Sequence, residues 1–128
     1  MKRIIIVIIP VIVAAIMLVI LKTVLFIGYV PSTSMEPTLK QDSIIIGIRR
    51  YRRLEKRDIV IFRHEGKLLV KRIAGVGGQH IRLYNQIYIV PQGCYLMLGD
   101  NAEDSYDSRY WSNPYVPESD IIAKVLHE

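Results

Sequence analysis

Three hydroxyl side chains lie close together between two prolines, in the stretch from Pro31 to Leu39. The prolines restrict the backbone on both sides of Ser34, so we expect this serine to be held in a defined place. A serine is a poor nucleophile until a nearby base takes its proton. If Ser34 performs nucleophilic chemistry, another part of the sequence must supply that base.

Lys71 is the best candidate for this base. In an extended strand it shares a face with the apolar Leu69 and Ile73, which is unusual for a lysine. To act near neutral pH, its pKa must fall by about 3 units from its ordinary value of about 10.4, and burial can achieve this. A surface lysine whose stem packs on apolar neighbours is the open alternative.

Other residue types that do chemistry offer less. Histidines are present, but without an obvious aspartate partner we interpret them as surface or ligand-free groups: His64, His80 and His127. No His or Cys cluster has the spacing of a metal site, so we expect neither a metal nor a cofactor. Cys94 is the single cysteine, which excludes an internal disulfide, and we expect it in the core.

The residues before the serine stretch form a long apolar run. Ile4 to Leu21 are eighteen residues without a charge, and as a helix they reach about 27 Å, close to the hydrocarbon thickness of a bilayer. Apolar residues resume after Lys22, so we assign residues 4–27 to a transmembrane anchor. A cleaved secretory signal is the competing interpretation, which the length of the run and the lack of a small-x-small cleavage site disfavour.

The charges before the apolar run predict its orientation. Lys2 and Arg3 place residues 1–3 in the cytoplasm by the positive-inside rule. Residues 28–128 then form an extracytoplasmic domain of a single-pass protein in the cell membrane.

The sequence beyond Pro31 predicts a mainly β fold, a small all-β domain. It consists of short apolar runs interrupted by Gly, Pro, Asn and Asp, and Tyr84-Asn85 suits a hairpin turn. The chain has 128 residues, 51% of them hydrophobic, and a net charge of +5, values that exclude a disordered chain and favour a single domain. We expect strands at residues 43–48, 58–63, 67–76, 80–83, 86–90, 95–98 and 121–126, and a loop from Gly99 to Pro117.

A basic cluster, Arg49 to Arg53, is the strongest local concentration of charge. A solvated loop is one interpretation, and contact with anionic headgroups beside the anchor is another. Nucleic acid is not an expected partner, because the predicted topology places the cluster outside the cell.

Four sequence blocks together resemble bacterial type I signal peptidase, also called leader peptidase. Their order, their spacing and the membrane anchor before them all match, and blocks and anchor together span nearly the whole chain. The blocks are Pro31 to Leu39, Asp58 to Phe62, Val70 to Gly75 and Gly99 to Arg109.

This resemblance implies a Ser-Lys dyad in a signal-peptidase catalytic core. Ser34 would attack the scissile carbonyl, and neutral Lys71 would take its proton and later return it. Ser32 and the backbone N–H of Ser34 would form the oxyanion hole. The resemblance gives supporting roles to residues of the last block: Ser105 would orient the lysine, Asp107 and Arg109 would form an ion pair, and Asp100 would support the same loop.

The resemblance also implies a substrate and partners. The family removes signal peptides from exported preproteins by cleaving after small residues at −1 and −3, so the lipid bilayer and the protein-export machinery are expected partners. Shallow pockets that exclude large side chains explain this preference. By position, the pocket residues would be Val30, Met35, Leu39 and Val70, and plain core packing is equally compatible with Leu39.

Several positions depart from the family pattern. Ala102, Glu103 and Asp104 stand where the family usually has Arg, Asp and Asn, so the loop loses a cation and becomes more acidic. Arg57 replaces a usual Gly before Asp58. The short interval from Gln79 to Tyr95 leaves no room for the second β domain of larger members, which predicts a minimal catalytic core.

Rival interpretations remain from other classes. A pilin-like structural protein with an apolar helix and a β-rich head would need neither Ser34 nor Lys71, and a catalytically impaired relative would keep the fold alone. Self-cleaving repressor proteases also use Ser and Lys, but they carry a DNA-binding domain for which the anchor leaves no place. Eukaryotic and archaeal signal peptidases have His at the position of Lys71, which favours the bacterial type.

Overall fold

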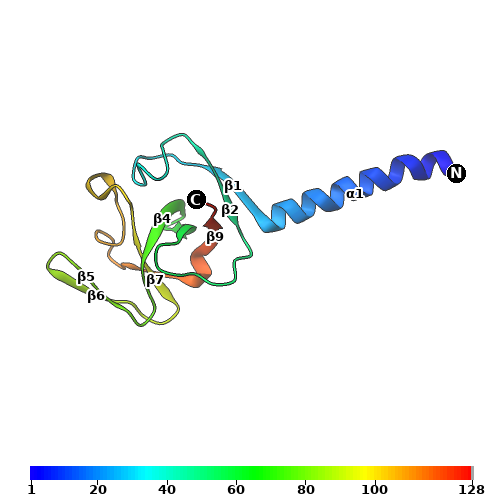
Figure 1. The fold of residues 1–128 in the computed structure, drawn as a ribbon. Coiled ribbons are helices and arrows are strands. Elements are labelled where there is room, and N and C mark those ends of the chain that lie inside the picture. The colour runs from blue at the N-terminus through cyan, green and yellow to red at the C-terminus, as the bar shows by residue number, and fades with distance from the viewer. Residues whose placement is uncertain (128) are drawn as a thin grey trace.

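The computed structural model describes residues 1–127 as one apolar helix followed by a mainly β domain (Figure 1). Helix α1 spans Lys2–Val24, contains Pro10 and has no buried residue. Among the described residues it is the one helix long and apolar enough to cross a membrane. Figure 1 shows it projecting away from the β domain, as a membrane anchor would.

The helix ends before the limit that we assigned to the anchor. Leu25 has extended backbone angles, and strand β1, Leu25–Tyr29, pairs antiparallel with strand β2, Ile44–Ile48. Residues 25–27 therefore belong to the sheet. The apolar run continues through this boundary, so hydropathy alone does not mark where the helix ends.

Seven strands form one antiparallel sheet in the order β1-β2-β9-β3-β4-β7-β8, and β5 and β6 form a separate hairpin. Two of the strands, β1 and β8, are absent from our predictions. β8 is only three residues long and lies within the stretch that we predicted as a loop. The remaining bounds are β3 Ile59–His64, β4 Lys67–Val76, β5 His80–Leu83, β6 Gln86–Ile89, β7 Cys94–Leu98, β8 Tyr115–Pro117 and β9 Ile121–Val125, with 3-10 turns at Ala102–Asp104 and Glu118–Asp120.

Strand β3 lies at the centre of the core. Its side chains alternate between two apolar clusters: Val60 and Phe62 join one, and Ile59 and Ile61 join the other. All four are buried, because both faces of the sheet are covered at this strand. The β3–β4 pairing sets Lys71 opposite Val60, so the centre of the core fixes the backbone position of this lysine.

One edge of β4 is left open next to Lys71. The strand pairs with β3 from Lys67 to Arg72, but with β7 only from Arg72 to Val76. Within residues 1–127, no strand pairs with the second edge of β4 between residues 67 and 71. The backbone groups on that edge are available to an added strand.

Substitution of Met97 tests how much the core contributes to the free energy of unfolding. Its side chain is fully buried in the same cluster as Trp111, the single tryptophan. Met97→Ala should lower the free energy of unfolding by about 2–5 kcal/mol through lost burial and the cavity left behind. Denaturant unfolding followed by Trp111 fluorescence measures this. Leu126→Ala, at a 56% exposed position, is the control and should change stability little; equal stability of the two variants would contradict the assigned core.

Candidate active site

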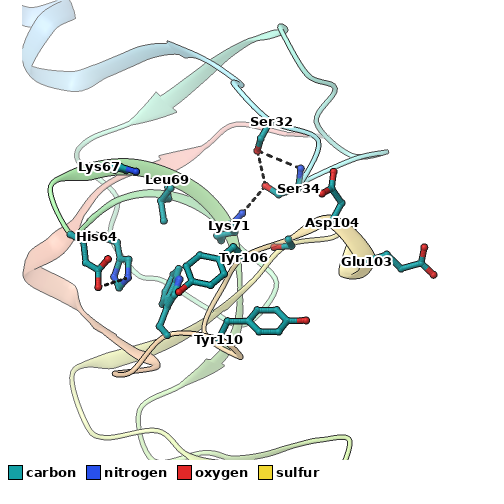
Figure 2. A pocket seen from close by; sticks show the side chains of 13 residues that line it. Ser32, Ser34, His64, Lys67, Leu69, Lys71, Glu103, Asp104, Tyr106 and Tyr110 are labelled. Atoms are coloured by element: carbon teal, nitrogen blue, oxygen red, sulfur yellow. Dashed lines mark hydrogen bonds and ion pairs between the residues drawn. The ribbon is translucent and has the colours of Figure 1, made fainter.

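Ser34 and Lys71 lie in direct contact inside the β domain. The Lys71 Nζ donates a hydrogen bond to the Ser34 Oγ over 2.6 Å, as the dashed line in Figure 2 marks. Both residues are buried, with 7% and 4% of their surface exposed. The structure thus brings together the serine and the lysine that the sequence singled out, although 37 positions separate them.

The surroundings of Lys71 favour its neutral form. Burial lowers the pKa of the Lys71 amine below its ordinary value, and the charge of Arg109 acts in the same direction. The carboxylates of Asp107 and Asp104 partly oppose this effect. A neutral amine has a lone pair, so it can accept the proton of a hydroxyl that it touches.

Ser32 lies beside the nucleophile candidate. Its hydroxyl donates to the Ser34 Oγ over 3.1 Å, and the Ser34 backbone N–H points at the Ser32 Oγ over 3.5 Å. Figure 2 shows the two serine side chains facing each other above Lys71. The Ser32 hydroxyl therefore lies next to the Ser34 Oγ, and the Ser34 N–H is directed at the Ser32 Oγ.

Asp107 organises the last sequence block from a fully buried position. Its carboxylate accepts hydrogen bonds from the Ser105 hydroxyl at 2.7 Å, from the Gly99 N–H at 2.9 Å and from the Arg109 guanidinium at 2.9 Å. Burial alone would raise the pKa of Asp107, but the bonds from Arg109, Gly99 and Ser105 hold this pKa below its ordinary value.

Ser105 does not make the contact that the resemblance implied. We expected its hydroxyl to bond the lysine, whereas it donates to Asp107, because a buried carboxylate requires every donor within reach. Ser105 still lines the same cavity as Lys71. Gly99 allows the loop to pack closely against the serine stretch, since a Cβ at position 99 would lie 2.6 Å from the Ser34 carbonyl oxygen.

Asp100 joins the loop to the serine stretch and to β4. It accepts two bonds from the Arg72 guanidinium, at 2.8 and 2.7 Å, and one from the Thr38 hydroxyl at 2.6 Å. Although burial opposes the shift, the bonds from Arg72 and Thr38 lower the pKa of Asp100. The carboxylate is therefore charged at neutral pH and fixes Arg72, the neighbour of Lys71.

Asn101 is a supporting residue for which we predicted no role. Its backbone N–H donates to the Ser34 carbonyl at 2.9 Å, and its side-chain amide donates to the Thr33 carbonyl at 3.1 Å. The Thr33 hydroxyl in turn donates to Asp104. The only available signal was that Asn101 follows Gly-Asp in the last block, which does not reveal a partner 68 positions away.

Two cavities meet at the serine–lysine pair. The larger, of about 590 Å³, contains Ser34 and Lys71 and extends to Tyr106, Tyr110 and Trp111. The smaller, of about 30 Å³, is lined by three of the four predicted pocket residues, Val30, Met35 and Val70, together with Leu68 and Leu69. Leu39 is not among its lining residues and packs in the apolar core cluster instead.

His64 is one of the histidines that we interpreted as surface or ligand-free groups. It is half-buried, and its ring stacks on Trp111 with 3.8 Å between the ring centroids. Both rings border the larger cavity.

Cys94, expected in the core, is half-buried at the edge of a small cluster around Leu96. Within residues 1–127, no three His, Cys, Asp or Glu residues are placed to hold a metal ion.

The structure combines an apolar helix long enough to cross a membrane, an antiparallel sheet and a buried contact between a serine and a lysine, two side-chain types that some serine hydrolases pair. The chain belongs to the signal peptidase family, peptidase S26, whose family model matches residues 1–89 and 83–127.

Relatives of the chain carry the same description. It is 32% identical to the probable signal peptidase I-2 of Synechocystis sp. over 132 residues, 77% of this chain and 60% of that protein. It is 29% identical to the signal peptidase I of Leptolyngbya laminosa over 134 residues, 77% of this chain and 65% of that protein. A shorter match, 49% over 39 residues, covers 30% of this chain and 12% of the signal peptidase I of Buchnera aphidicola. The chain thus spans less than two thirds of the length of these relatives.

Lys71→Met tests the lowered pKa of the lysine. Between that pKa and the ordinary value of 10.5, the unfolded chain binds a proton at Lys71 that the folded chain lacks. The free energy of unfolding should then rise with pH, by up to about 1.4 kcal/mol per pH unit, and level off above pH 10.5. Lys71→Met should lack this increment. Denaturant unfolding across a pH series measures both, and parallel curves for the two proteins would contradict the shift.

Proposed function

We propose that this protein is a membrane-bound serine endopeptidase that removes signal peptides from exported preproteins, cleaving after small residues at −1 and −3. The single observation that carries the proposal is the 2.6 Å contact between the Lys71 Nζ and the Ser34 Oγ in a buried site. Membership of the signal peptidase family supports the substrate class.

The first step is attack by Ser34. Its Oγ forms a bond to the scissile carbonyl carbon while its proton passes to the neutral Lys71 amine. The short contact supports direct transfer, because a general base must lie within hydrogen-bond reach of the proton it takes. The burial that lowers the pKa of Lys71 keeps the amine ready for this role.

The Ser32 hydroxyl and the Ser34 N–H stabilise the oxyanion of the tetrahedral intermediate. The Ser32 hydroxyl already lies beside the Ser34 Oγ, and the Ser34 N–H is directed at the Ser32 Oγ. In the intermediate both protons would turn from these partners to the new negative charge. Loss of one such donor typically costs about 10²–10³ in rate.

Lys71 then returns the proton to the leaving amine, and the peptide bond breaks. The signal peptide remains as an ester on Ser34. A water molecule, deprotonated by Lys71, attacks this ester and restores the serine. Asp107 and Arg109 hold the loop against the dyad through their ion pair of 2.9 Å.

The open edge of β4 provides a place for the substrate. An extended peptide can add to residues 67–71 by strand pairing, which brings its carbonyl groups past Lys71 toward Ser34. The small cavity beside the dyad measures about 30 Å³, and about 10–15 Å³ is needed for one water-sized group. It therefore accepts a side chain such as that of alanine and excludes larger ones, which supports cleavage after small residues.

The proposal includes a single-pass topology with residues 1–3 in the cytoplasm and the β domain outside. Lys2 and Arg3 support this orientation by the positive-inside rule. The bilayer and the export machinery are then the partners that deliver preproteins to the site, and nucleic acid is not a partner.

Ser34→Ala and Lys71→Ala should each reduce cleavage by about 10⁴-fold or more, because each removes one member of the dyad. The full chain in detergent is given a preprotein with alanine at −3 and −1, and the product is identified by its new N-terminus. Ser112→Ala and Lys40→Ala, both at exposed positions, are the matched controls and should keep activity. Full activity of either dyad variant, in protein with unchanged Trp111 fluorescence, would refute the mechanism.

The pH dependence of kcat/KM tests the base. Because burial lowers the pKa of Lys71, the rate should fall as the pH drops through that lowered pKa, where the amine gains a proton and can no longer accept one. Asp104→Asn removes a charge that raises this pKa, so it should move the fall to lower pH. A rate that stays constant into acid in the unmodified protein would exclude Lys71 as the base.

A further inference from the structure

Tyr110 borders two neighbouring cavities of the β domain. One is the cavity of about 590 Å³ that contains Ser34 and Lys71. The other, of about 490 Å³, lies under the turn of the β5–β6 hairpin and is lined by Tyr84, Tyr88 and Arg109 among others. The Tyr110 ring lines both cavities, which are therefore neighbours, and we refer to the two together as the cleft.

An aromatic pair borders the dyad cavity, and one of its rings, Tyr110, also lines the second cavity. The rings of Tyr106 and Tyr110 stack with 5.9 Å between their centroids and 13° between their planes. Both remain exposed, at 67% and 58%, and Figure 2 shows them beside the dyad cavity. The Arg109 guanidinium lies 5.3 Å from the centre of the Tyr110 ring and is bound to the buried Asp107, so this ring is held in place without being covered.

The β5–β6 hairpin is fixed at its base and open at its tip. Ile81 packs against the cluster around Leu96, and it approaches Gly75 so closely that a Cβ there would lie 2.6 Å from its Cγ1. At the tip, Tyr84 is 82% exposed and has a positive φ of 53°. Figure 1 shows the hairpin extending away from the sheet. Neither the core nor the proposed dyad requires an exposed tyrosine here.

We propose that this cleft binds the segment of the preprotein that follows the scissile bond, the first residues of the mature protein, with Tyr106, Tyr110 and Tyr84 as its contact residues. The inference rests on the proposed function, in which the residues before the bond occupy the small cavity next to Val30 and Val70. Both cavities meet at Ser34 and Lys71, so the chain on the other side of the bond leaves through the larger cavity toward Tyr110.

The chemistry of the cleft suits a polypeptide of varied sequence. Flat aromatic rings provide contact area for backbone and side chains at low entropic cost, without demanding one residue type. The cleft therefore favours substrates that continue beyond the cleavage site, as preproteins do, over isolated signal peptides.

Binding to a Ser34→Ala chain tests this inference without requiring cleavage. Two fluorescent peptides share the same signal-peptide residues; one ends about two residues after the bond and the other continues for about ten, up to roughly 33 Å of extended chain. Anisotropy in detergent gives the Kd of each. The longer peptide should bind about tenfold more tightly, the effect of one good aromatic contact.

Two substitutions locate the gain. Tyr110→Ala and Tyr84→Asn should each reduce the difference between the two peptides while leaving the Kd of the shorter peptide unchanged. Asparagine tolerates the left-handed backbone at position 84, so the second variant removes the ring with the least strain. Leu126→Ala is the control for an exposed apolar residue outside the cleft.

The outcomes separate the two proposals. Equal Kd values for the two peptides, or a gain that survives in both tyrosine variants, would overturn the cleft assignment. If the gain is present and depends on the tyrosines, the assignment stands even when the unmodified chain fails to cleave, and that failure would count against the endopeptidase proposal alone. Cleavage by the unmodified chain together with equal Kd values for the two peptides would support the endopeptidase proposal and overturn the cleft assignment.

Discussion

The buried contact between the Lys71 amine and the Ser34 hydroxyl is the constraint on which the rest of the structure depends. An ammonium in this place would lose its hydration without a carboxylate in contact to compensate, so the protein must hold the amine where its neutral form is stable. Strand β3 provides the apolar surroundings, and its pairing with β4 fixes the lysine in register. The same strand therefore forms the core of the domain and provides the burial that lowers the pKa of the Lys71 amine.

The loop from Gly99 to Arg109 brings acidic groups near Lys71, and the charges of Asp107 and Asp104 partly offset the lowering of its pKa by burial. Asp107 and Asp100 are each neutralised by an arginine, Arg109 and Arg72. The loop lacks the cation that the family usually has at position 102. Arg109 contacts the backbone at that position, because its Nη2 also donates to the Ala102 carbonyl at 3.2 Å.

Local patterns in the sequence were informative where chemistry and spacing coincide. A lysine among apolar neighbours and a serine between prolines made Lys71 and Ser34 candidates, and the resemblance of the four blocks to signal peptidases selected them. Alternating apolar runs predicted most strands. Strand β1 was missed because Leu25 to Tyr29 continues the apolar character of the anchor. The stacking of His64 on Trp111 and the Ser105–Asp107 bond depend on tertiary approach, which no local pattern encodes. The stacked tyrosines have the spacing of ordinary loop residues and carried no signal before the structure.

The direct junction between α1 and β1 has a geometric consequence. No residue separates the end of the helix at Val24 from the strand that begins at Leu25, and five strand residues advance roughly 17 Å toward the serine stretch. Under the proposed function, with a bilayer around the helix, Ser34 would lie at a fixed distance from the lipid surface. Preproteins would then be cleaved at a peptide bond that lies at this distance from the membrane as well as next to suitable side chains.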